Sequence, residues 1–419
     1  MMHELHVYLH SQCVGTLSLV GGRLSFQYAA EALNNPSLGP LSQSLPLQRE
    51  PFSDLQSRPF FAGLLPEGRM RNLVARQAQV SSQNEFGLLE FIGGECAGAV
   101  SISTGDQPPP SDNAYDVKWL TSEQLAAVID ELPKRPMLAG TEGLRLSLAG
   151  AQDKLPVVYD GTRIGLPLNG SPSTHILKPP IREVEDSVTN EAFCLHLAKA
   201  MKLPVAQASI YRAGHQHALL VKRYDRIEGS EGEVQRIHQE DFCQALGVIS
   251  ELKYQNEGGP GFPQIFDLLR STTRPSALHV LNLLDYAVFN TLVGNHDAHG
   301  KNFSLLYHGS EPVLAPLYDV VSTAIYPELT VKMAMKIGGK YKFSEVMDRH
   351  WDRFSEENGL GKAQVRKRVR ELAIQLPKKA RQTAGAQPEF ADHPIVKRII
   401  DLIDRRTALT LERLAVNAR

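Results

Sequence analysis

The chain has 419 residues and a mass of 46.3 kDa, a length that predicts two or three domains at ~150 residues each. Apolar residues make up 42% and charged residues 22% of the chain, which suffices for a buried core and excludes disorder as the dominant state. The 45 lysines and arginines balance 46 aspartates and glutamates. This balance excludes a surface made basic throughout to coat nucleic acid, although it allows a local basic patch.

The cysteines and the apolar runs indicate the compartment. Cys13, Cys96, Cys194 and Cys243 include no C-x-x-C pair and no Cys/His cluster with zinc-finger spacing, so we interpret them as reduced thiols. The N-terminus lacks the basic and apolar regions of a secretion signal, and no apolar run approaches the ~20 residues that span a bilayer. We therefore expect a cytoplasmic protein without a membrane partner.

Predicted strands dominate the first hundred residues. Short alternating runs occupy His6–Leu9, Gly15–Val20 and Arg23–Tyr28. A glycine-opened strand is expected within Gly93–Ser103, and the segment 104–116, which contains three consecutive prolines, is predicted to be a linker. The composition therefore predicts a β-rich subdomain that ends near residue 105.

Helices and strands alternate in the remainder of the chain. Thr121 is the predicted N-cap of a helix, because Gln124 completes a capping box three residues later. Strand character occurs at Leu144–Asp160, His175–Lys178, Ala208–Tyr211, Ala218–Arg223, Phe303–Tyr307 and Val313–Leu317, the last two as a hairpin. Helices are predicted over 186–201, over Ser276–Val293 and through the last hundred residues.

The loop that follows the predicted helix Ser276–Val293 reads GNHDAHGKN. Asp297 and Asn302 are five residues apart, which is the spacing of the kinase catalytic loop H-R-D-x-x-x-x-N. In such a loop the Asp accepts the hydrogen bond of the attacking hydroxyl, and the Asn carbonyl oxygen holds magnesium. Asp319 follows the predicted hairpin and can supply a second metal ligand, as the D-F-G aspartate does in kinases.

Two other interpretations of this loop remain open. Asp, Asn and Gly are common in loops because they tolerate turns, so the pattern alone does not establish catalysis. His296, Asp297 and His299 also form an H-D-x-H pattern that could bind a divalent ion in a metallohydrolase. Gly294 and Gly300 argue for a loop there, and no third ligand has obvious spacing.

Four features upstream of this loop follow the order of a protein kinase. SLAGAQDK, over Ser147–Lys154, is a small-residue turn in which backbone N–H groups can approach phosphates. Lys178 ends an apolar strand and can pair with nucleotide phosphates, and Glu191 in the next helix can hold that lysine. A lysine in such a place more often caps a strand at the surface, and helical glutamates are usually solvated. The segment KRYD at 222–225 ends a strand where an adenine-binding hinge would lie.

Longer segments carry a family resemblance. SLAGAQDKLPV, THILKPP, SVTNEAFCLHLAKAMKLPV, VKRYDR, IHQEDFCQALG, KYQNEGGPG and GNHDAHGKNFSLL…LAPLYDVVS occur in this order, after FQYAAEAL, LSQSLPL and FFAGLLPEG. Together they resemble the HipA family of serine/threonine kinases, the toxins of bacterial toxin–antitoxin modules. SLAGAQDK, which is similar to the family pattern S-[IV]-A-G-A-Q-[ED]-K, is the most specific match.

The resemblance implies a fold and a division of the chain. The fold class would be α+β, a two-lobed protein-kinase-like fold with a β-rich N-terminal subdomain and an all-helical C-terminal part. The subdomain would cover residues 1–105. The kinase-like N-lobe and the start of the C-lobe would cover 117–272, and the helical C-lobe with the catalytic and metal-binding loops would cover 273–419.

The resemblance also implies roles for single residues, with ATP and Mg as cofactors. Asp297 would be the catalytic base, and Asn302 and Asp319 would hold the metal. Ser147 would be autophosphorylated, which would add about −1.5 to −2 charge beside a site for triphosphate and silence the kinase. The ATP-binding residues would be Ala149, Gly150, Ala151, Gln152, Asp153, Lys154, Lys178, Lys222, Arg223, Tyr224, His299, Lys301, Asn302, Tyr318 and Asp319.

The partners implied are macromolecules. They would be a HipB-like helix-turn-helix antitoxin, operator DNA bound through the antitoxin complex at the nucleoid, and an aminoacyl-tRNA synthetase as substrate, glutamyl-tRNA synthetase first. Phosphorylation of a synthetase would inhibit translation. The basic stretch 362–381, in which Glu371 is the one opposing acid, is a candidate for contact with DNA phosphates, although such a stretch is more often a solvated helix face.

Two departures from the family pattern occur, and two rival functions remain to be separated by experiment. Lys222 replaces an acidic residue of some members, and His296 replaces other small or polar residues before the catalytic Asp. The first rival is a small-molecule phosphotransferase that uses the same Asp and Asn. The second is a DNA-bound regulatory protein that is catalytically silent, which a test of ATP turnover would identify.

Overall fold

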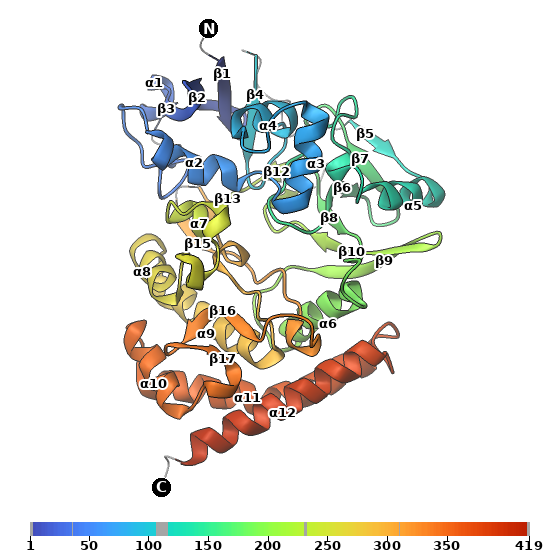
Figure 1. Ribbon diagram of the computed structural model, residues 1–419, viewed down its shortest axis with the longest axis vertical. Helices are drawn as coiled ribbons and strands as arrows, with labels where there is room; N and C mark the ends of the chain where they lie inside the picture. Colours follow the sequence, from blue (N-terminus) through green and yellow to red (C-terminus); the bar gives the residue numbers. More distant parts are fainter. Residues whose placement is uncertain (1–2, 36, 106–115, 230–232, 310, 417–419) are drawn as a thin grey trace. The chain divides into compact units, whose positions relative to one another are not determined.

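The computed structural model describes residues 3–35, 37–105, 116–229, 233–309 and 311–416 (Figure 1). The chain forms two compact units that alternate along the sequence. Unit 1 comprises Met1–Pro179, Tyr211–Glu251 and Ser304–Pro312, and unit 2 comprises Pro180–Ile210, Leu252–Phe303 and Val313–Arg419. The predicted domain boundaries near residues 105 and 272 would divide the chain into consecutive segments, whereas each unit consists of three separate segments. These boundaries stay predictions. Residues 106–115 of the predicted linker lie outside the described residues.

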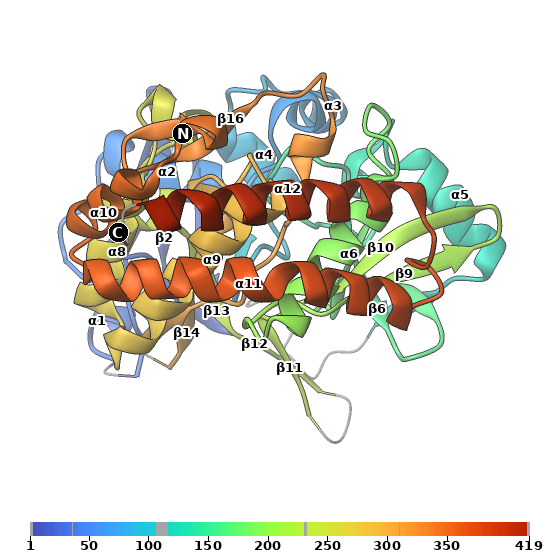
Figure 2. The same ribbon diagram turned by 90° about the horizontal axis from the view of Figure 1, so that it is seen from below.

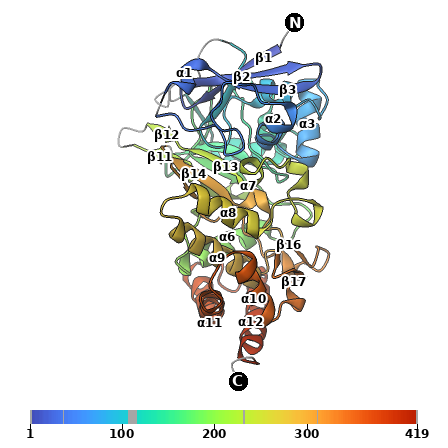
Figure 3. The same ribbon diagram turned by 90° about the vertical axis from the view of Figure 1, so that its left-hand side faces the viewer.

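An antiparallel sheet in unit 1 confirms the strands predicted near the N-terminus (Figure 3). Its order is β3-β2-β1-β4, with β1 at His3–Leu9, β2 at Gln12–Val20, β3 at Arg23–Tyr28 and β4 at Val100–Ser103. Leu17 of β2 lies opposite Leu5 on β1 and Phe26 on β3, and all three side chains are fully buried. Alternation along the strands therefore buries one face of the sheet.

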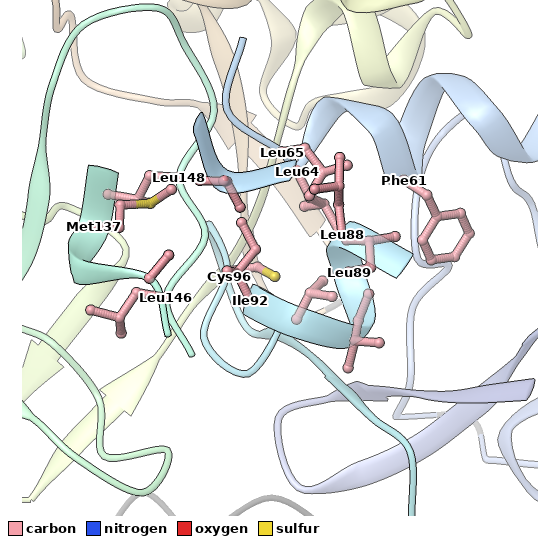
Figure 4. Close-up of a cluster of buried hydrophobic side chains, with 14 of the residues drawn as sticks. Phe61, Leu64, Leu65, Leu88, Leu89, Ile92, Cys96, Met137, Leu146 and Leu148 are labelled. Atoms are coloured by element: carbon pink, nitrogen blue, oxygen red, sulfur yellow. The ribbon is translucent and has the colours of Figure 1, made fainter. Parts of the chain in front are cut away.

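Helices of unit 1 pack with this sheet around a common core. They are α1 (Ala30–Leu33), α2 (Asp54–Gly63), α3 (Gly68–Ala78), α4 (Glu85–Ile92) and α5 (Ser122–Glu131), and the short helix α7 (Phe242–Ala245) contacts α2. Phe61, Leu88 and Leu89 of these helices meet Leu146 and Leu148 in one cluster of buried side chains (Figure 4). The predicted capping box of α5 is confirmed, since Thr121 accepts from the Gln124 N–H and Gln124 accepts from the Thr121 N–H.

A six-stranded sheet has the order β5-β7-β6-β8-β10-β9. Its strands are β5 (Val117–Trp119), β6 (Leu155–Tyr159), β7 (Ile164–Pro167), β8 (His175–Lys178), β9 (Ala208–Ala213) and β10 (Gln216–Lys222). Two smaller sheets follow, β11 (Arg226–Glu228) with β12 (Val234–Arg236), and β13 (His238–Asp241) with β14 (Ser304–His308) and β15 (Glu311–Leu314). The predicted hairpin is therefore confirmed as β14–β15, although its second strand ends at Leu314.

Unit 2 is mainly helical and is arranged around α9 (Ser276–Val293), whose predicted bounds are confirmed. The other helices are α6 (Ser187–Ala200), α8 (Phe262–Thr272), α10 (Asp348–Glu357), α11 (Lys362–Ala386) and α12 (Pro394–Val416). The long helices α11 and α12 lie side by side and both contact α9 (Figure 2). The last hundred residues are not entirely helical, because β16 (Lys332–Ile337) and β17 (Lys340–Lys342) form a two-stranded sheet there.

A buried carboxyl group fixes the segment 41–45 to β13 and β14 within unit 1. Glu240 is 1% exposed, and it accepts hydrogen bonds from the hydroxyls of Ser42 and Tyr307 and from the Gln43 N–H. Burial disfavours the charged form and raises the pKa of Glu240 from 4.5 to about 7.

Replacing Glu240 by glutamine is expected to weaken the pH dependence of folding. Because the folded state of the wild type holds this proton more tightly, its contribution to stability is complete below pH 4.5 and is lost as pH rises through about 7. Relative to Glu240→Gln, the wild type should lose about 3 kcal/mol of unfolding free energy between pH 4.5 and 8. Denaturant unfolding at both pH values measures the unfolding free energy of each protein. An equal loss in the wild type and in Glu240→Gln between the two pH values would contradict the prediction.

Candidate active site

The predicted catalytic loop begins where α9 ends. Gly294 caps α9 with a φ of 77°, a conformation that side chains rarely adopt. A Cβ atom at this position would lie 2.7 Å from Leu402 and 2.8 Å from Ala324, so the close approach of α12 also requires glycine. From residue 291 to residue 307, Asp297 is the one exposed residue. A general base must reach its substrate, and the loop presents this side chain alone.

Hydrogen bonds within unit 2 fix the backbone of Asp297. Its N–H donates to Asn295 Oδ1 at 3.1 Å, and its carbonyl accepts from the His299 N–H and from Asn302 Nδ2, both at 2.8 Å. One carboxylate oxygen accepts from the Tyr254 hydroxyl at 2.7 Å. The loop therefore holds the carboxylate in a defined position before a substrate binds, as catalysis by positioning requires.

Asn302, a predicted metal ligand, belongs to this hydrogen-bonded group, and Asp319, the other one, directly follows a residue that is bound to it. Asn302 donates through Nδ2, which directs its carbonyl oxygen away from the Asp297 carbonyl. Tyr318 donates to the Lys301 carbonyl at 2.7 Å, which connects the neighbour of Asp319 with the neighbour of Asn302. Asp319 has a φ of 57°, a strained conformation for a residue other than glycine that is common at functional sites.

The donor set fits magnesium in its chemistry. One carboxylate and one amide oxygen are the hard oxygen ligands that Mg²⁺ takes when phosphates and water complete its shell. No group of three or more His, Cys, Asp or Glu side chains that could hold a metal occurs among the described residues. This result does not support the H-D-x-H interpretation, in which His296, Asp297 and a further ligand would bind the ion.

The predicted phosphate loop lies in unit 1 and is closed by its own lysine. Lys154 Nζ donates to the Ala149 carbonyl at 2.7 Å, and the Gly150 carbonyl accepts from the Glu67 N–H at 3.0 Å. Gly150 has a φ of 109°, and a Cβ atom there would lie 2.7 Å from Lys154 Nζ. A lysine beside exposed backbone in a small-residue turn suits phosphate binding.

Ser147, the predicted autophosphorylation site, is fully buried in unit 1. Its hydroxyl donates to the Leu64 carbonyl at 2.7 Å, and its N–H donates to the Glu95 carbonyl at 2.8 Å. Leu146 and Leu148 on either side point into the apolar cluster of Figure 4. The hydroxyl can therefore accept a phosphoryl group only after this segment has left the core.

The other predicted nucleotide contacts are distributed over both units. Lys178 is buried at the end of β8 in unit 1, and Glu191 is buried in α6 of unit 2, so their pairing stays a prediction. The Lys222 ammonium pairs with Glu228 at 2.9 Å, and the Tyr224 hydroxyl donates to Gln239. The Arg223 guanidinium is 1% exposed and pairs with Asp225, so any contact of this residue with adenine would come from its backbone.

The basic stretch 362–381 lies on α11. Its side chains form ion pairs with several acidic residues from outside the stretch, as well as with Glu371. Ion pairs join Lys362 to Glu356, Arg366 to Asp348 and Asp352, Arg368 to Asp285 and Glu371, and Arg381 to Asp404. The expectation of Glu371 as the one opposing acid is therefore wrong, because other helices bring further carboxylates to this face. Much of the charge that would attract DNA phosphates is neutralised within unit 2.

Sequence reasoning missed residues that support the catalytic loop. Tyr254 donates to Asp297 and packs edge-on against His299, with ring centroids 5.1 Å apart. It lies in the segment KYQNEGGPG, which carried the family resemblance without a role for any residue. Asn295, inside the loop itself, could have been recognised as a turn residue whose side chain accepts a nearby N–H.

Known protein families match most of the chain. The HipA-like C-terminal domain matches residues 146–380, and the HipA N-terminal domain matches residues 5–103. A Sinorhizobium fredii protein named "Putative kinase Y4mE" is 47% identical over 354 residues, 84% of each chain. The "Serine/threonine-protein kinase toxin HipA" of Shewanella oneidensis is 31% identical over 379 residues, 86% of each chain.

A solved structure matches the fold over almost the full length. It is the Shewanella oneidensis toxin–antitoxin complex of HipA, HipB and operator DNA, with a TM-score of 0.86 at 26% identity, covering 98% of both chains. The kinase-like α+β fold is therefore shown. Within the described residues, none of the helices is long and apolar enough to cross a membrane.

Proposed function

This chain belongs to the HipA family of serine/threonine protein kinases, and we propose that it acts as the toxin of a toxin–antitoxin module by transferring the γ-phosphoryl group of ATP to a protein hydroxyl. The arrangement around Asp297 carries this proposal. An exposed carboxylate stands on a loop fixed by Asn295, His299 and Asn302, with the strained Asp319 connected to the same group through Tyr318 and Lys301.

Each residue then has a chemical task. Asp297 accepts the hydrogen bond of the attacking hydroxyl and orients it toward the phosphorus. Asn302 and Asp319 offer oxygens to magnesium, which when bound offsets charge on the phosphate oxygens. Lys178, Lys154 and the backbone N–H groups of Ala149–Lys154 bind the phosphates. Little covalent chemistry is required of the protein, so positioning and electrostatics determine the rate.

The proposal assigns ATP contacts to several further residues. His299 and Lys301 are buried beside Asp297 and flank the phosphates, and Tyr318 supports this part of the site through the Lys301 carbonyl. Adenine lies against the hinge, where Lys222 and Tyr224 contribute side chains and Arg223 contributes backbone.

The proposed partners follow the solved relative. That protein is a toxin in complex with HipB and operator DNA, and we propose a HipB-like antitoxin and indirect operator binding for this chain as well. The proposed substrate is an aminoacyl-tRNA synthetase, with glutamyl-tRNA synthetase as the first candidate, and its phosphorylation would inhibit translation. Because α11 is largely neutralised by ion pairs, we place DNA contact on the antitoxin rather than on this helix.

Autophosphorylation of Ser147 is expected to add one phosphate to the chain. Phosphatase-treated wild type is incubated with magnesium and ATP, and the intact mass should rise by one phosphate, whereas Ser147→Ala should gain none. The burial of this hydroxyl predicts a slow reaction that urea at low concentration accelerates, because the segment must leave the core. A phosphate on Ser147→Ala would contradict the assignment of the serine.

The toxin proposal has its own test. Purified glutamyl-tRNA synthetase and a panel of other synthetases are incubated with Ser147→Ala and ATP, and the mass of each is measured. Modification of one synthetase supports the proposal. Turnover of ATP on small metabolites alone would identify a small-molecule phosphotransferase, and absence of any ATP turnover would indicate a silent regulatory protein.

A further inference from the structure

His296, which immediately precedes Asp297, is bound at every polar group it has. Its N–H donates to Thr323 Oγ1 at 2.8 Å, and its carbonyl accepts from the Ala334 N–H at 2.8 Å. On the ring, Nδ1 lies 3.0 Å from the Thr330 carbonyl and Nε2 lies 2.8 Å from Arg406 Nη2. The residue is 5% exposed, so these contacts are protected from water.

The two partners of the ring define its protonation. A carbonyl oxygen only accepts, so Nδ1 must carry the hydrogen, and a guanidinium only donates, so Nε2 must be the acceptor. Burial lowers the pKa of His296 to about 4, which keeps this ring neutral at neutral pH. The imidazole therefore forms a fixed bridge between the segment before β16 and the C-terminal helix.

Arg406 of α12 is held at the end of α9. Its Nη1 donates to the Thr291 carbonyl at 2.6 Å, in the last turn of α9, and its guanidinium carbon lies 4.4 Å from the centroid of the Phe343 ring. The side chain is 7% exposed, and within the described parts of the chain no carboxylate forms an ion pair with it. The negative end of the α9 dipole and the aromatic face stabilise this buried cation instead.

We propose that Arg406 and His296 are positioning residues, through which helix α12 sets the place of Asp297 for phosphoryl transfer. The inference rests on the function proposed above. His296 precedes Asp297 directly, so a rotation of its backbone would move the carboxylate, and a misplacement of ~1 Å can lower a rate by ~100-fold. The C-terminal helix, more than a hundred residues from the loop in sequence, would then be part of the catalytic apparatus.

The double-mutant cycle of Arg406→Met and His296→Asn tests this pairing. Methionine keeps much of the volume of the arginine but donates no hydrogen bond. Asparagine can still donate to Thr330 but is too short to reach Arg406 in place of Nε2. Each single variant should lower kcat for ADP release by about 10- to 100-fold, with the KM for ATP unchanged within about twofold. The double variant should be no slower than the slower single variant, because both changes remove the same contact, the hydrogen bond between Arg406 and His296.

Arg405→Met is the matched control, since Arg405 is the exposed neighbour on the same helix. It should keep the wild-type kcat. If Arg406→Met fails to fold, His296→Asn and Arg406→Lys test the proposal instead. Because the lysine has one donor nitrogen in place of two, Arg406→Lys should have a kcat between those of the wild type and His296→Asn. Wild-type kcat in a folded Arg406→Met or His296→Asn variant, or effects that multiply in the double variant, would overturn the proposal.

A spectroscopic measurement separates this inference from the proposed function. In the full-length protein labelled with ¹⁵N-histidine, His296 should show the shifts of a neutral ring with hydrogen on Nδ1 and a hydrogen bond accepted at Nε2. Arg406→Met should move the Nε2 resonance alone, because Thr330 still holds the hydrogen on Nδ1, and Arg405→Met should leave both resonances unchanged. If the wild type turns over no ATP, the proposed function fails even though the signature is present. If ATP is turned over and the signature is absent, the inference fails alone.

Discussion

Asp297→Asn is expected to lower the rate of phosphoryl transfer by about 10²- to 10⁴-fold, the range over which a positioned general base contributes. The amide keeps the size of the side chain and can still accept from the Tyr254 hydroxyl, which lies 2.7 Å from Asp297 Oδ1. It removes the carboxylate charge that orients the attacking hydroxyl. The measurement is the transfer of radiolabelled phosphate from ATP to the chain or to a synthetase.

Two controls make the result specific to catalysis. Asp297 is exposed, so the unfolding free energy of Asp297→Asn should stay within about 0.5 kcal/mol of the wild type. Asp267→Asn changes an aspartate that is 78% exposed on α8 of the same unit, and it should keep the full rate. A loss smaller than tenfold in a folded Asp297→Asn would mean that another group holds the hydroxyl.

Local patterns in the sequence predicted the parts of the site that one short segment contains. The spacing of Asp297 and Asn302 is such a pattern, and the structure shows the amide of Asn302 bound to the Asp297 carbonyl. The bounds of α9 follow from its continuous apolar run and from Gly294, which ends it. These features depend on neighbours within a few residues, which are visible in the sequence.

The contacts that depend on distant segments could not be predicted in this way. Tyr254 is 43 residues from Asp297, and Arg406 is 110 residues from His296. No periodicity or motif encodes such a pairing, since the fold alone brings these residues together. The charge of α11 was misjudged for the same reason, because the carboxylates of Asp285 and Asp404 come from other helices.

The predicted hinge segment, residues 222–225, also contributes to a buried group of ion pairs that its sequence does not indicate. Arg223, predicted near the nucleotide, and Arg226 are buried with Asp225 and with Glu95 from a segment far upstream. Their side chains are 0–2% exposed. The carboxylates of Asp225 and Glu95 offset the charges of these two arginines, the buried guanidinium of Arg236 also acts on Glu95, and each charge depends on the others.

Asp225→Asn is expected to lower the unfolding free energy at pH 7 by about 3–5 kcal/mol, because it leaves two buried guanidinium groups with Glu95 alone. Asp225 pairs with Arg223 at 2.7 Å and with Arg226 at 3.1 Å, and it also accepts from the Gly98 N–H at 2.8 Å. Guanidinium-induced unfolding measures the loss.

The pH dependence of this loss identifies its cause. Burial alone would raise the pKa of Asp225. The nearby arginines outweigh burial and hold this pKa far below its ordinary value of 3.8, so the carboxylate stabilises the fold above that pH. The gap between wild type and Asp225→Asn should stay constant from pH 8 to 5 and narrow as pH falls below about 4. Asp130→Asn, at a pair with His215 that is about half exposed, should cost under about 1 kcal/mol. Equal losses of unfolding free energy in the two variants would mean that the buried ion pairs of Asp225 stabilise the fold no more than an exposed pair does. The hinge would then be held by apolar packing instead.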